Sequence, residues 1–96
     1  MLFLSSHNSD LVKYVTFTGT ITTSSGKGEI LVSSMTGYDA TKWSNRVAWS
    51  GFGIFSGDNR YNCCLSVRTT TSGDTLSAMS HGVDGAFSIT LYVAYR

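Results

Sequence analysis

The feature of this sequence that most limits its fold is the unbroken alternation of its last run, residues 86–96. The larger apolar members of that run are Phe87, Ile89, Leu91, Val93 and Tyr95, each separated by one other residue. In a β-strand, successive side chains point to opposite faces, so residues two apart share a face. We therefore expect a closing strand that packs one face onto a core.

Shorter runs with β-strand character precede this one and are separated by turn-forming residues. The runs are 11–23, 29–35, 46–55, 60–71 and 75–80, and the breaks are 24–28, 36–45, 56–59, 72–74 and 81–85. Most breaks are too short for the crossover segments that parallel strands need. The pattern predicts an all-β fold of about six antiparallel strands, either a small β-sandwich or a jelly-roll-like domain.

Two of the turns predict hairpins. We expect 11–23 to pair with 29–35 across the turn at 24–28, and 46–55 to pair with 60–71. The longer break at 36–45 predicts a loop with room for one short helical turn. The run 46–55 is apolar at both parities, which predicts burial on both faces.

Length and charge bound the class of protein. Ninety-six residues suit one domain, which we place at 11–96. Residues 1–10 have no period and end in a polar run, so we expect a flexible or partner-docked N-terminal arm. The formal net charge is only +1, and no stretch approaches the roughly 20 apolar residues of a membrane span. We therefore expect that the protein does not bind nucleic acid and does not insert into a membrane.

No constellation of residues predicts catalysis or a cofactor. Cys63 and Cys64 are adjacent, so on a strand they point to opposite faces, and with His7 and His81 they do not form a zinc motif. The Ser-x-x-Lys pattern at 24–27 lies in a predicted turn, whereas the enzymes that use it need a helix there. We expect a protein that is not an enzyme and has no catalytic residues, no metal site and no cofactor.

Aromatic and polar residues in the loops are typical of a sugar-binding surface. Flat rings cover the apolar faces of sugars, while carboxylate, amide and guanidinium groups bind the hydroxyls. The candidate ligand-binding residues are Tyr38, Asp39, Trp43, Asp58, Asn59 and Arg60. Aromatic residues in so small a domain can instead fill the core, and that alternative stays open for these rings.

A thin core predicts self-association. The chain has 15 serines and 12 threonines, which add little hydrophobic stabilisation when buried. The strand at 46–55 therefore needs a second apolar surface, which a symmetric partner can supply. The candidate interface residues are Trp49, Phe52 and Ile54.

The neutral, hydroxyl-rich, proline-free sequence and its closing strand at 86–96 resemble the distal domains of bacteriophage tail fibres and other virion-associated β-proteins. The resemblance implies a homotrimer in the virion, synthesised in the host cytoplasm. It implies a non-enzymatic receptor-binding domain of a tail fibre or tail tip that contacts host surface glycan. The alternatives are a structural capsid-decoration or tail-assembly protein and a free-standing lectin-like carbohydrate-binding domain.

Overall fold

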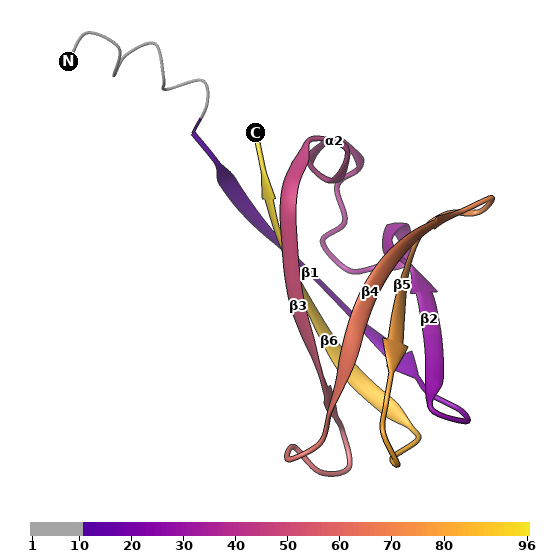
Figure 1. The fold of residues 1–96 in the computed structure, drawn as a ribbon. Coiled ribbons are helices and arrows are strands. Elements are labelled where there is room, and N and C mark those ends of the chain that lie inside the picture. Colours follow the sequence, from indigo (N-terminus) through magenta and orange to yellow (C-terminus); the bar gives the residue numbers. More distant parts are fainter. Residues whose placement is uncertain (1–10) are drawn as a thin grey trace, which may run out of the picture.

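The computed structural model describes residues 11–96, which form six strands and two short helices (Figure 1). The elements are β1 (Lys13–Thr22), β2 (Lys27–Leu31), the 3-10 helix η2 (Val32–Ser34), α2 (Ala40–Ser44), β3 (Arg46–Phe55), β4 (Asn62–Thr70), β5 (Gly73–Met79) and β6 (Ala86–Tyr95). The expected arm at 1–10 lies outside the described residues. None of the helices in 11–96 is long and apolar enough to cross a membrane.

All strand pairs are antiparallel and belong to one curled sheet with the order β1-β6-β3-β4-β5-β2. The prediction of a small all-β domain with six antiparallel strands is therefore confirmed. The closing strand β6 lies between β1 and β3 and pairs with both along its whole length. Such a position explains its strict alternation, because one face of β6 lines the core and the other remains outside.

The sheet bends sharply between β3 and β4. These strands pair only beside their connecting turn, at Gly53–Cys63 and Ile54–Asn62, and β4 then pairs with β5. The sheet therefore has two halves, β1–β6–β3 and β4–β5–β2, which enclose the core between their inner faces (Figure 1). The expected second hairpin is present at its base, but its strands separate beyond it.

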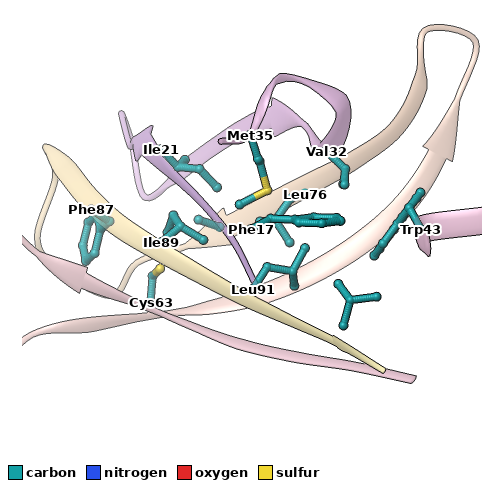
Figure 2. Close-up of a cluster of buried hydrophobic side chains, with 12 residues drawn as sticks. Phe17, Ile21, Val32, Met35, Trp43, Cys63, Leu76, Phe87, Ile89 and Leu91 are labelled. Atoms are coloured by element: carbon teal, nitrogen blue, oxygen red, sulfur yellow. The ribbon is translucent and has the colours of Figure 1, made fainter. Parts of the chain in front are cut away.

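The core is a single cluster of buried side chains to which both halves contribute (Figure 2). Its members are Phe17, Ile21, Val32, Met35, Trp43, Cys63, Leu76, Ala78, Phe87, Ile89, Leu91 and Val93. Phe87 and Trp43 lie at opposite ends of this cluster, and Phe17 lies between them. Cys63 is buried and Cys64 is exposed, as predicted from their adjacency on a strand.

The predicted hairpin between 11–23 and 29–35 is wrong, although its turn is correct. Ser25 and Gly26 adopt positive φ angles of 54° and 81° in a tight turn. Beyond the bridge between Ser24 and Lys27, however, β1 pairs with β6 and β2 pairs with β5. The β5–β6 connection holds this turn, since the Gly26 amide donates to Asp84 Oδ1 at 2.9 Å. The turn thus carries the chain from one half of the sheet to the other.

Residues 29–45 also differ in detail from expectation. Strand β2 ends at Leu31 and is followed by η2, so the expected strand does not reach residue 35. The loop at 36–45 contains the expected helical turn as α2. Thr36 exchanges two backbone hydrogen bonds with Thr18, at 2.8 and 3.0 Å. The segment therefore covers the middle of the free edge of β1, which would otherwise expose unpaired backbone groups.

Candidate functional site

The six residues predicted to bind a ligand do not form one site. Tyr38, Asp39 and Trp43 lie in and before α2, whereas 58–60 form the β3–β4 turn. Helix α2 and this turn lie at opposite ends of the molecule (Figure 1). One small ligand therefore cannot contact both groups.

Trp43 is a core residue with only 4% of its surface exposed. Its indole nitrogen donates a hydrogen bond of 2.6 Å to Asp74 Oδ2, and the Arg46 guanidinium lies 4.0 Å from the ring centroid. Phe17 packs on it at 6.2 Å and on Tyr38, edge-on, at 5.6 Å. Both aromatic rings of the α2 region thus support packing, and Trp43 has no open face for a sugar.

The predicted carboxylates are engaged within their own loops. Asp39 caps α2 by accepting a hydrogen bond of 3.0 Å from the Lys42 amide. Asp58 pairs with Arg60 at 2.7 Å, and the hydrogen bonds from Arg60 lower the pKa of Asp58. Asn59 is exposed between them. These contacts account for the polar residues of both loops as turn and cap residues.

Asp74, in β5, contacts residues of α2, of the start of β3 and of the end of β4. Its carboxylate accepts from the Trp43 indole and, at 2.8 Å, from the Thr69 hydroxyl, and Arg46 lies 3.6 Å away. The donors Trp43 and Thr69, with a smaller effect of the Arg46 charge, lower the pKa of Asp74. This cluster closes the end of the molecule where β3 and β4 no longer pair.

Replacing Asp74 with asparagine is expected to lower the free energy of unfolding by about 1–2 kcal/mol at neutral pH, because hydrogen bonds to a charged acceptor are lost. The folded-state pKa of Asp74 lies below its unfolded value. Its contribution is therefore complete above the ordinary aspartate pKa and is lost as the pH falls through the folded-state pKa. Urea unfolding of both proteins should show a difference that shrinks in acid.

The control is Asp58→Asn, which removes an exposed ion pair in the β3–β4 turn. We expect no measurable shift in its urea midpoint at neutral pH, because exposed pairs contribute little. A difference between wild type and Asp74→Asn that stays constant from neutral pH into acid would contradict the assigned role.

The outer side of the half β1–β6–β3 is a surface without charge, which we call the neutral face. Its outward positions are Tyr14, Thr16, Thr18, Thr20 and Thr22 of β1, Ser88, Thr90, Tyr92 and Ala94 of β6, and Ala48, Ser50, Phe52 and Ile54 of β3. Three of its aromatic rings are markedly exposed: Tyr14 by 76%, Tyr92 by 45% and Phe52 by 41%. Exposed aromatic residues grouped on one sheet face are typical of a contact surface.

The neutral face carries two of the three residues predicted at an interface. Phe52 packs against Tyr92 at 6.1 Å between ring centroids, and Ile54 is half-buried beside it on β3. Trp49 has the opposite parity and packs partly against the core. Tyr14 and Tyr92 are not among the contact residues predicted from the sequence. Each alternates in phase with the small and hydroxyl residues of its strand, and this pattern indicates the outward side.

The outer side of the other half, β4–β5–β2, is hollowed by a groove of about 530 Å³. An ion pair crosses it, because Arg68 Nη2 of β4 lies 2.9 Å from Glu29 Oε2 of β2. Ser77 of β5 donates to the same oxygen at 3.4 Å. The hydrogen bond and charge of Arg68 lower the pKa of Glu29. Lys27, Ser66 and Met79 line the groove on the same side of this pair.

A second hollow of about 510 Å³ continues the groove beyond the ion pair. Glu29 and Arg68 line both hollows, so the pair stands between them. The remaining side chains around the second hollow are mainly hydroxyls: Thr70, Thr71, Ser72 and Thr75. The groove and the second hollow together form one channel with the ion pair at its middle, and most of the groove's own surface is apolar. The sequence had not indicated this channel.

Within residues 11–96, no group of three His, Cys, Asp or Glu side chains is placed to hold a metal ion. Comparison with protein-family models, with curated proteins and with solved structures finds no match to this chain. A functional assignment therefore depends on the surfaces described above.

Proposed function

We propose that this chain is a non-enzymatic structural subunit of a virion, of the tail-fibre or capsid-decoration kind, that assembles with copies of itself through the neutral face. The observation that carries this proposal is the absence of charge from the outward positions of three adjacent strands, 14–22, 48–54 and 88–94. The virion setting rests on the resemblance of the sequence to tail-fibre domains.

The chemistry of the neutral face favours a second copy as its occupant. Two identical charged surfaces repel one another, whereas identical neutral surfaces meet without that cost. Tyr14, Phe52 and Tyr92 supply apolar area, and the surrounding hydroxyls can pair with one another across an interface. Three copies with their neutral faces turned inward around a threefold axis would form a closed prism.

A lysine at the centre of the neutral face is expected to prevent assembly. Tyr92→Lys places one like charge per copy at the contact, so we expect at least about a 100-fold weaker association, which corresponds to about 3 kcal/mol. Light scattering coupled to size exclusion should show multiples of 10.4 kDa for the wild type, with a trimer as the expected species, and a monomer for the variant.

Tyr61→Lys is the matched control, because Tyr61 is also 45% exposed but is not a neutral-face position: it lies opposite Phe55, whose side chain packs against the core. This variant should keep the wild-type mass. A wild type that stays monomeric at tens of micromolar, or a Tyr92→Lys protein with unchanged mass, would refute assembly through this face. A monomer that binds sugar would favour the lectin-like alternative.

A further inference from the structure

We propose that the groove across β4–β5–β2 binds an acidic oligosaccharide, a sugar chain that carries carboxylate groups. This inference concerns the outer face of the other half of the sheet, and it does not depend on assembly through the neutral face. It gives the glycan contact expected from the sequence a location away from Trp43 and the β3–β4 turn.

Arg68 is the residue that points to a carboxylate. Within the described residues its guanidinium uses only Nη2, in the pair with Glu29, so Nη1 and Nε remain as donors. Arg60, by contrast, directs Nε and Nη2 onto Asp58, and Arg46 is held by Trp43 and Asp74. A guanidinium binds a carboxylate through two parallel N–H groups. Glu29 therefore orients Arg68 and leaves it capacity for a second anion.

Charge and hydroxyl groups favour a sugar as the carrier of that carboxylate. Lys27 and Arg68 against Glu29 leave the groove with one excess positive charge. Ser66 and Ser77 lie on neighbouring strands at paired positions between these charges and can exchange hydrogen bonds with sugar hydroxyls. Glu29 adds an acceptor, since the sugar hydroxyl is a donor as well as an acceptor. The apolar side of a sugar ring can rest on Met79, which is half exposed.

The length of the channel favours a chain over a single sugar. The second hollow is lined by threonine and serine hydroxyls, so successive sugar units can lie on both sides of the ion pair. An extended acidic peptide is a poorer occupant. Peptides that join a sheet do so through backbone hydrogen bonds at an edge, whereas this channel crosses the outward side chains of three paired strands.

The test is a titration of the full chain with 3′-sialyllactose, with trigalacturonic acid and with neutral lactose, followed by amide chemical shifts in a ¹H–¹⁵N spectrum. Both acidic sugars should shift Ser66, Ser77 and their neighbours in a saturable way, and lactose should bind at least about tenfold more weakly. An acidic peptide, hexaglutamate, serves as the second comparison. Arg68→Gln is expected to weaken binding of the acidic sugars by about tenfold or more, since it removes a charged donor.

Arg60→Gln is the matched control, because it also breaks an exposed arginine–carboxylate pair but lies outside the groove. Arg60→Gln should bind the acidic sugars like the wild type. Glu29→Gln should give the amide spectrum of a folded protein, with an affinity for these sugars that differs from the wild-type value. Equal affinity for lactose, shifts outside the groove, no saturable shift, tighter binding of hexaglutamate, or an Arg68→Gln protein that binds like Arg60→Gln would each overturn the proposal. The native mass, measured on the same samples, tests assembly separately, so failure of either proposal is recognised on its own.

Discussion

Replacing Trp43 with alanine is expected to lower the free energy of unfolding by about 3–5 kcal/mol. Trp43 fills one end of the core (Figure 2), so its removal leaves a cavity beside Phe17. It also removes a donor from Asp74 and the ring on which the Arg46 guanidinium lies. A domain of this size has a total stability of about 5–15 kcal/mol, so the variant should be near the limit of folding. Urea unfolding followed by circular dichroism measures the change.

Two further variants make this result interpretable if Trp43→Ala does not fold. Trp43→Phe keeps most of the ring but loses the indole N–H, so it should fold and show a smaller loss of about 1–2 kcal/mol. Tyr14→Ala removes an aromatic ring that is 76% exposed on the neutral face, and it should leave the unfolding of a monomer nearly unchanged. A urea midpoint for Trp43→Phe equal to that of wild type would show that the bond to Asp74 contributes nothing.

The second large effect is expected at Gly28, where β2 passes close to the end of β1. A methyl group added there would lie 2.4 Å from the carbonyl oxygen of Thr22 and 2.8 Å from Ile21 Cγ2. A backbone carbonyl in a strand cannot move away as a flexible side chain can. Gly28→Ala should therefore cost about 2–3 kcal/mol, in the upper part of the roughly 1–3 kcal/mol typical of overpacking, as measured by chemical unfolding.

Gly19→Ala is the control for Gly28→Ala, because both positions lie in strands of the same curled sheet. A methyl group at Gly19 would meet first the flexible Ile30 Cδ1, at 3.2 Å, and then the Met35 side chain. Its effect should stay below about 1 kcal/mol, since less conformational freedom in the unfolded chain offsets part of the contact. Equal losses at the two glycines would argue against the close approach of β1 and β2.

Under the two proposals above, the two outer faces would serve different tasks. The neutral face lies on β1–β6–β3 and the channel lies on β4–β5–β2, with the core between these halves of the sheet. Assembly through the neutral face would leave the channel exposed on every copy. Repeated copies of one weak site raise the overall affinity for a surface that carries many ligands, without any new contact.

The sequence by itself determined the strands, their faces and most turns. Alternation over 86–96 and over 62–68 correctly separated inward from outward residues, because the pattern is local and follows from the pleat of the strand. It failed at Tyr61, which shares the parity of the inward residues but is 45% exposed. The bounds of β3 match the predicted run at 46–55, and the two cysteines point to opposite faces as predicted. The all-β class followed from these local patterns.

Only the tertiary structure decided which strands pair and which aromatic residues are buried. A two-residue period indicates which way each side chain points, but it does not specify the neighbouring strand. The turn at 24–28 therefore suggested a hairpin, whereas the chain there changes from one half of the sheet to the other. Trp43 gave no periodic signal in its short helix, and its burial depends on Asp74 and Phe17, which are distant in sequence. The pair of Glu29 and Arg68 likewise forms only because β5 brings β2 beside β4. Contacts between distant residues are set by how the whole sheet closes around its core, and no local pattern encodes that closure.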